Sequence, residues 1–212
     1  MPYYNRMRWL IKDAGERKRA AEALCRLRGQ LDAIVPPKDA EDNLLLATWN
    51  IRDLGKPLRL RRGWGPRLPE SWFYIAEVIS RFDVVAVQEV NEMGEWLKVM
   101  EILGRQWDFI ATDVTDRGLG GNGERMTFAY DTRKVTFQRI AGEIVLPASY
   151  LISKAELEVG RERVVAGNQF KRTPFMASFQ SGWLRFDLCA VHLFYGSESG
   201  DKLAQRVEEI AT

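Results

Sequence analysis

Cysteine, histidine and long apolar runs are all scarce in this sequence. Cys25 and Cys189 are the only cysteines among 212 residues, and neither a C-x-x-C pair nor a Cys/His cluster occurs. This argues against a disulfide framework and against a structural zinc site. No stretch approaches the roughly 18 apolar residues of a membrane-spanning helix, and no apolar signal-peptide segment lies near the N-terminus. We therefore expect a cytoplasmic protein without a membrane span.

The charges of the chain nearly balance. The sequence has 31 basic and 29 acidic residues, which gives a net charge of +2, and 46% of its residues are apolar. That apolar fraction is ordinary for a globular domain. A near-neutral net charge gives no indication of a nucleic-acid partner, so a phosphate-binding face would have to come from local clusters of basic residues.

Residues 1–43 differ in character from the rest of the chain. Residues 13–34 are rich in alanine, arginine and lysine, carry leucines at helical spacing, and are followed by Pro36 and Pro37. This pattern predicts a helix that ends before the prolines. The basic side chains could touch phosphate or an anionic lipid surface, but a solvated face on a packed helix is the favoured interpretation. We therefore divide the chain into a basic helical extension and linker, 1–43, and a domain, 44–212.

Polar side chains end two of the predicted strands. An apolar run at 44–48 ends in Asn50 and Arg52, and a second run at 84–87 ends in Gln88 and Glu89. A helix predicted at 71–82 separates the two runs, so we expect neighbouring strands that are buried on both faces. Their polar ends would meet at the carboxyl edge of the sheet, where open α/β sheets bind ligands. Oxygen ligands of this kind suit Mg²⁺ or Mn²⁺, with Ca²⁺ as an alternative.

The remaining segments predict a mixed α/β protein. Residues 55–69 predict a loop of glycine, proline and basic residues, which contacts a nucleic-acid backbone or a phosphorylated headgroup, or is merely an exposed basic loop. A polar stretch at 153–169 is interpreted as an excursion over the surface. The other predicted elements are a helix at 92–103, a strand at 107–111, a hairpin of 125–130 with 134–140, a hairpin of 175–179 with 183–191, and a helix at 201–212.

Five short motifs, each at or beside a predicted strand, occur in an order that resembles a known superfamily. They are TWNIR at 48–52, VQEV at 87–90, GERMTFAY at 123–130, RTPF at 172–175 and AVHL at 190–193. Together they resemble the endonuclease/exonuclease/phosphatase superfamily, which includes pancreatic-type deoxyribonuclease. The resemblance implies a four-layer α/β/β/α sandwich and metal-dependent hydrolysis of phosphodiesters. Nucleic acid, DNA or RNA, is the substrate class and partner that it implies.

The resemblance also implies roles for single residues. Glu89 matches a metal ligand, and a carboxylate that ends an apolar strand is itself a good candidate for one. Asn50 would ligate the metal weakly, orient water or hold the phosphate. His192, the only histidine in the chain, matches the catalytic histidine, and Glu124 matches the carboxylate that orients it and keeps it protonated. The alternative for each is a structural residue at the end of a strand.

Two arginines match phosphate-binding positions of the superfamily. Arg52 lies two residues after the asparagine, and Arg172 precedes the strand that contains proline and phenylalanine. Guanidinium groups suit bidentate contacts with phosphate, although a plain surface arginine is an alternative for both. Tyr130, Arg125 and Asp53 are weaker candidates.

The later superfamily motifs G-D-x-N and S-D-H do not occur in this sequence. They supply further metal ligands and a second histidine, so we expect a truncated, split or degenerate domain whose site is completed by a C-terminal segment or a second chain. The 212-residue chain alone is expected to be weakly active or inactive. Two rival functions stay open: a phosphatase or phosphodiesterase acting on a sugar phosphate, nucleotide or lipid headgroup, and a non-catalytic binding module.

Overall fold

The computed structural model describes residues 1–39, 43–55, 67–113, 124–147, 153–159, 162–168, 170, 172–193 and 199–211. These residues form two compact units, Met1–Thr136 with Gln180–Arg185 and Phe137–Phe179 with Phe186–Thr212. Within the described ranges, none of the helices combines the length and the apolar composition needed to cross a membrane. The first unit contains η1 (Tyr4–Arg6), α1 (Met7–Leu10), α2 (Ala14–Ile34), β1 (Leu46–Leu54), α3 (Glu70–Ile79), β2 (Val84–Val90), α4 (Met93–Leu103), β3 (Trp107–Ala111) and β4 (Arg125–Asp131).

A four-stranded sheet organises the first unit. Its strand order is β1-β2-β4-β3, with β1 parallel to β2 and with β4 antiparallel to both β2 and β3. Parallel strands cannot be joined by a tight turn, and here α3 lies in the connection between β1 and β2. The prediction of two neighbouring strands separated by a helix is therefore confirmed.

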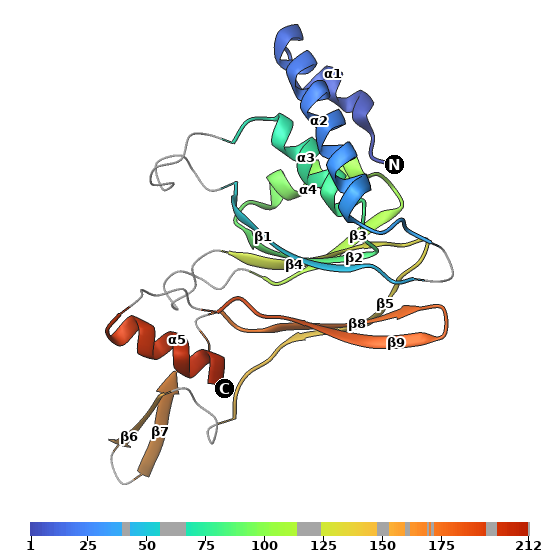
Figure 1. Ribbon diagram of the computed structural model, residues 1–212. Coiled ribbons are helices and arrows are strands. Elements are labelled where there is room, and N and C mark those ends of the chain that lie inside the picture. The colour runs from blue at the N-terminus through green and yellow to red at the C-terminus, as the bar shows by residue number, and fades with distance from the viewer. Residues whose placement is uncertain are drawn as a thin grey trace. The chain divides into compact units, whose positions relative to one another are not determined.

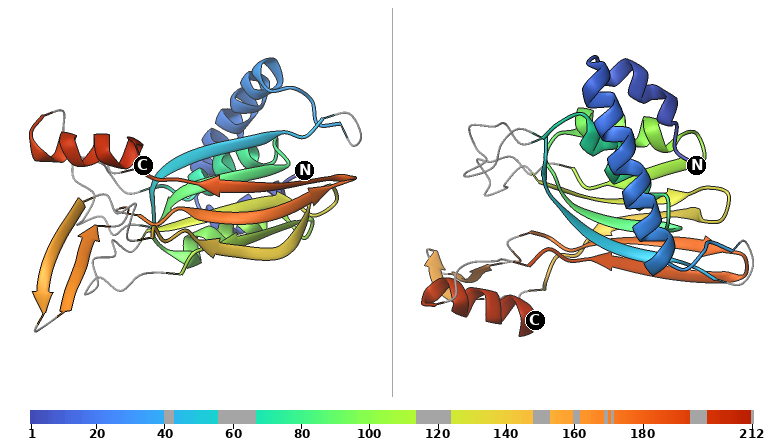
Figure 2. Two further views of the ribbon diagram at one scale, coloured as in Figure 1. Left: turned by 90° about the horizontal axis from the view of Figure 1, so that it is seen from below. Right: turned by 45° about the horizontal axis from the view of Figure 1, so that its top comes forward.

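The core of the first unit lies between this sheet and its helices. Helices α2, α3 and α4 lie on one face of the sheet, as the views in Figures 1 and 2 agree. Phe73 of α3 and Trp96 of α4 are fully buried in the same cluster as Val85 and Val87 of β2. Burying a side chain of this size stabilises a fold by about 2–3 kcal/mol, so these contacts fix the helices on the sheet.

The predicted N-terminal helix is confirmed, and it packs on this core. The side chain of Asp13 caps α2 by accepting a hydrogen bond from the Glu16 N–H at 2.8 Å. Ala20 and Leu24 belong to the same core cluster as the sheet residues. On the outer side, Arg19 forms a 2.7 Å ion pair with Glu70 of α3. The part of the helix that carries these residues therefore belongs to the first unit.

Two expectations from the sequence were wrong. Strand β1 is not buried on both faces, because it is an edge strand and alternate residues such as Thr48 and Asn50 are exposed. The segments around 131–133 do not form a hairpin, because β4 and β5 (Thr136–Glu143) belong to different sheets. The polar stretch after residue 152, interpreted as an excursion over the surface, contains two antiparallel strands that were not predicted, β6 (Ser153–Val159) and β7 (Glu162–Asn168).

The second unit contains most of a three-stranded sheet of order β5-β8-β9. Strands β8 (Phe175–Ser181) and β9 (Leu184–Ala190) are hydrogen-bonded neighbours, as the predicted hairpin requires, and they lie side by side in Figure 2. Their connection includes Gly182, whose φ of 56° favours glycine. The aromatic ring of Phe179 packs on that of Phe186, with 5.9 Å between the ring centroids. The unit also includes β6, β7 and helix α5 (Asp201–Ala211).

A buried ion cluster occupies one end of the four-stranded sheet. Asp83, which precedes β2, and Asp131, which ends β4, are both buried. Lys38 lies 3.1 Å from Asp83 and 2.9 Å from Asp131, and Lys134 lies 3.2 Å from Asp83. Burial alone would raise the pKa of Asp131, but hydrogen bonds from Arg133 and Lys38 outweigh it and lower the pKa to about 2. The cluster therefore keeps the Asp131 carboxylate ionised at neutral pH.

We expect Asp131→Asn to destabilise the protein by about 2–3 kcal/mol at pH 7, because it removes the buried carboxylate that pairs with Lys38 and Arg133. Since the ordinary pKa of 3.8 falls to about 2 in the folded state, the stabilisation by Asp131 is complete above pH 4 and is lost as the pH falls toward 2. Urea unfolding of both proteins across this range should show the difference shrinking. Asp108→Asn, at an exposed position of β3, is the control, and an equal loss there would contradict the prediction.

Candidate metal site

The opposite end of the same sheet collects polar side chains from three strands. Strand β1 runs parallel to β2, and the register pairs Asn50 with Gln88. Strand β4 runs antiparallel to β2, and Val90 pairs with Arg125 at its start. The carboxyl ends of β1 and β2 therefore meet the amino end of β4, where Glu124 directly precedes the strand. This register brings Asn50, Glu89 and Glu124 to one edge of the first unit.

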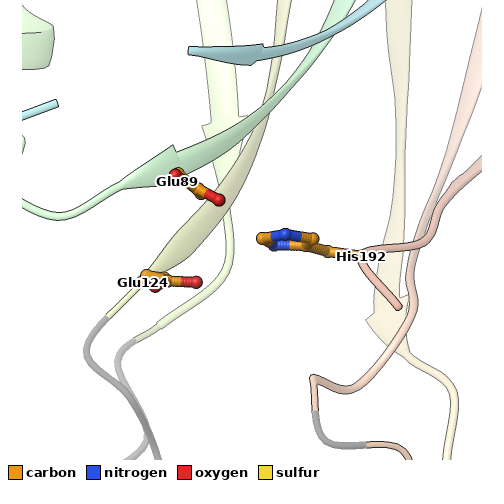
Figure 3. Close-up of side chains that lie close together, drawn as sticks. All are labelled: Glu89, Glu124 and His192. Carbon is orange, nitrogen blue, oxygen red and sulfur yellow. The ribbon is translucent and has the colours of Figure 1, made fainter. Parts of the chain in front are cut away.

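The carboxylates of Glu89 and Glu124 lie close together. One oxygen of Glu89 lies within 4.8 Å of one oxygen of Glu124, and Figure 3 shows both side chains reaching out from the edge of the sheet. Oxygen ligands bind Mg²⁺ or Ca²⁺ at about 2.0–2.6 Å, so two ligands across one cation lie roughly 4–5 Å apart. The two carboxylates therefore fit a single hard cation. Both side chains are half-buried, which leaves the site open to solvent.

Asn50 holds the Glu89 carboxylate in place. Its Nδ2 donates a hydrogen bond to Glu89 Oε1 at 2.7 Å, and its Oδ1 accepts one from the Arg52 N–H at 2.9 Å. The amide oxygen thus serves a local turn, while the amide nitrogen orients the carboxylate. In this arrangement the side chain of Asn50 supports a candidate metal ligand through a hydrogen bond, as partners outside a coordination sphere commonly do.

Both strand ends are irregular where the site lies. The register shifts between Asn50 and Leu54 in β1 and between Val87 and Val90 in β2. Arg52, Asp53 and Glu89 have φ values of 56°, 58° and 65°, in the left-handed region that non-glycine residues rarely adopt. Each such residue costs on the order of 1–3 kcal/mol, and strain of this kind concentrates at functional sites.

The strained turn supplies a second hydrogen bond to Glu89. The backbone N–H of Asp53 donates to Glu89 Oε2 at 2.9 Å, so each carboxylate oxygen of Glu89 has a donor. The side chain of Asn91 donates to Asp53 Oδ1 at 3.3 Å and to the Glu89 carbonyl at 3.2 Å. Asn91 was not predicted from the sequence, although it follows the VQEV motif directly. Asp53, a weaker candidate, contributes through its backbone.

Arg67 also contacts the turn, and its role was not predicted from the sequence beyond membership of the basic loop. Its Nη2 donates to the carbonyl oxygens of Ile51 and Arg52 at 2.6 and 2.7 Å. The side chain of Arg52, a predicted phosphate ligand, is exposed at the same edge. The remaining basic residues of the predicted loop, Lys56, Arg59, Arg61 and Arg62, lie outside the described residues.

Two predicted site residues belong to the second unit. His192 follows β9 by two residues and is half-buried, and Arg172 precedes β8 and is also half-buried. The weaker candidate Tyr130 lies at the far end of β4, away from Glu124. Burial, with the carboxylate of Asp108 beside the hydroxyl, raises the pKa of Tyr130 to about 12, so its hydroxyl stays protonated at neutral pH. It cannot serve there as a base.

A separate hollow of about 550 Å³ lies among residues of the N-terminal segment and of α2 and α3. Charged side chains that line it include Arg28, Glu77 and Arg81. The Glu77 carboxylate accepts hydrogen bonds from Arg81 at 2.6 and 3.0 Å and is buried. Neither Glu89 nor Glu124 lines this hollow, so it is distinct from the candidate metal site.

Comparison of the chain with models of known protein families gave no match, and no curated protein proved similar in sequence. The chemistry of the site must therefore be judged from its own residues. Two nearby carboxylates, one held by an amide and a backbone N–H, suit a hard divalent cation better than a soft one.

If the two carboxylates share a cation, Mn²⁺ should stabilise the protein, by about 2.7 kcal/mol at a hundredfold excess over its Kd. Glu89→Gln removes a charged ligand and should abolish this gain, measured as the rise in Tm on adding Mn²⁺ after treatment with a chelator. Glu92→Gln changes an exposed carboxylate three residues further along and should keep the gain. An undiminished gain in Glu89→Gln would contradict the site.

Proposed function

We propose that this protein is a metal-dependent phosphodiester hydrolase of the endonuclease/exonuclease/phosphatase type, and that nucleic acid is its substrate. The observation that carries the proposal is the pair of carboxylates, Glu89 and Glu124, within 4.8 Å at a strained sheet edge. The motifs that supply them resemble this superfamily in residue type and in order. The four-layer α/β/β/α sandwich of the superfamily is part of the same proposal.

The first-unit residues would prepare the site for a phosphate. A bound Mg²⁺ or Mn²⁺ would supply the positive charge that stabilises the phosphorus oxygens during displacement. Glu89 would hold this ion together with Glu124, while Asn50 and the Asp53 N–H keep the Glu89 carboxylate oriented. The hydrogen bonds are already formed, so little reorganisation accompanies binding. Arg52, exposed at the same edge, would hold a neighbouring phosphate through its guanidinium.

In this proposal His192 acts as the catalytic histidine. Its imidazole would donate a proton to the leaving oxygen or a hydrogen bond to the scissile phosphate, and Glu124 would orient it. Support comes from the AVHL motif at the end of β9 and from the acidic residue at the start of β4. Arg172 would bind the phosphate backbone of a nucleic acid.

The test measures cleavage of plasmid DNA and of RNA with Mg²⁺ or Mn²⁺. It compares the protein isolated from its natural source with the 212-residue chain. We expect Glu89→Gln, Glu124→Gln and His192→Ala to lower the rate at least a hundredfold, because each removes a group that acts on the phosphate. Glu124→Gln should also move the basic limb of the pH profile to lower pH, since the imidazolium loses a neighbouring anion.

Glu92→Gln is the matched control and should keep full activity. A phosphoinositide and a nucleotide, assayed in parallel, separate a nuclease from an enzyme of small phosphoesters. Binding of DNA without cleavage under every condition would identify a non-catalytic module and contradict the hydrolase proposal.

A further inference from the structure

We propose that Arg67 is a positioning residue of the metal site. Its guanidinium would fix the left-handed turn of Arg52 and Asp53 and thereby aim the Asp53 N–H at the Glu89 carboxylate. The inference rests on the proposed function only for the identity of the bound metal. The hydrogen bonds that carry the inference all lie within the first unit. The contacts that carry it are those of Arg67 with the backbone of the turn.

The contacts of Arg67 are with backbone atoms on the turn. Its Nη2 donates to the carbonyl oxygen of Ile51 at 2.6 Å and to that of Arg52 at 2.7 Å. Hydrogen bonds from a charged donor are shorter and stronger than those between neutral groups. Two successive carbonyls held by one nitrogen fix the orientation of the peptide planes between them. Arg67 therefore restrains backbone geometry where the turn begins.

The turn needs such a restraint because its own residues disfavour it. Arg52 and Asp53 have φ values of 56° and 58°, and neither is a glycine. Ile51 before the turn and Leu54 after it are both buried, so the two ends are anchored in the core. A chain of L-residues would relax from left-handed φ values unless surrounding contacts oppose it. Arg67 opposes this relaxation through its hydrogen bonds to the carbonyl oxygens of Ile51 and Arg52.

The turn also orients Glu89, the proposed metal ligand. The Asp53 N–H donates to Glu89 Oε2 at 2.9 Å, and Asn91 holds the Asp53 side chain at 3.3 Å. Glu89 itself has a left-handed φ of 65°. Its own backbone is therefore not relaxed and does not by itself hold the carboxylate in place. Loss of the turn would release the Asp53 N–H, which helps to orient Glu89. Partners of this kind commonly change metal affinity by about 10–100-fold when they are mutated.

The experiment compares Arg67→Ala with Arg67→Lys by two measurements. Hydrogen exchange of the Asp53 amide, followed by NMR without metal, should become at least about tenfold faster in Arg67→Ala, because the bond to Glu89 opens more often. The Kd for Mn²⁺ should rise about tenfold in the same variant. Arg67→Lys should restore most of both properties, since an ammonium group can donate to two carbonyls.

Two further variants separate positioning from general stability. Arg133→Ala removes a cation from the ion cluster at the other end of the sheet, and it should leave both the Asp53 exchange rate and the Kd for Mn²⁺ unchanged. Adding Arg52→Gly to Arg67→Ala should recover part of the Asp53 protection, because glycine adopts a left-handed φ without strain.

Unchanged exchange of the Asp53 amide in Arg67→Ala would overturn the inference, whatever the metal affinity. Absence of Mn²⁺ binding by the unaltered protein would instead overturn the metal site. The role of Arg67 in the turn would then be decided by the exchange rate of the Asp53 amide alone. Equal effects of Arg133→Ala and Arg67→Ala on exchange would show that Arg67 acts only through global stability, and this too would overturn the inference.

Discussion

The double pairing of β2 is the constraint on which the rest of the first unit depends. It is parallel to β1 on one side and antiparallel to β4 on the other. One register therefore fixes which residues meet at each end of the sheet. At one end Asp83 of the loop before β2 lies beside Asp131 of β4, and at the other Glu89 of β2 lies beside Glu124. A slip by one residue would turn every side chain of β2 to the opposite face.

The two ends use carboxylates in opposite ways. At the ion cluster, Lys38 and Lys134 lie within ion-pair distance of buried aspartates, so the charges are compensated and the end is stabilised. At the other end, two glutamates stand close together on a backbone with three left-handed residues. Strain and neighbouring like charges lower stability unless another group compensates them. A purely structural edge would avoid this combination of backbone strain and neighbouring like charges, whereas it fits an edge that binds a ligand.

The proposed enzyme draws its groups from both compact units. Glu89 and Glu124, which would hold the cation, lie in the first unit together with Asn50 and Asp53, which donate to Glu89. The proposed catalytic histidine, His192, lies in the second. Cation binding can therefore be measured separately from catalysis, since the residues that would bind the cation, and the hydrogen bonds that orient them, lie within one unit. The position of Arg67 beside the turn follows the same logic, because it supports the ligand and takes no part in proton transfer.

The sequence by itself determined the order of helices and strands from α2 to β4 and placed Asn50 and Glu89 at the ends of neighbouring strands. These features follow from apolar runs and from proline, which are local properties of the chain. Only the tertiary structure decided that β4 and β5 separate into different sheets and that a polar stretch near residue 160 pairs as two strands. It also revealed the positive φ of Glu89 and the contacts of Asn91 and Arg67 with the turn. Strand partners, bulges and side-chain-to-carbonyl bonds arise between residues far apart in sequence, so no local pattern encodes them.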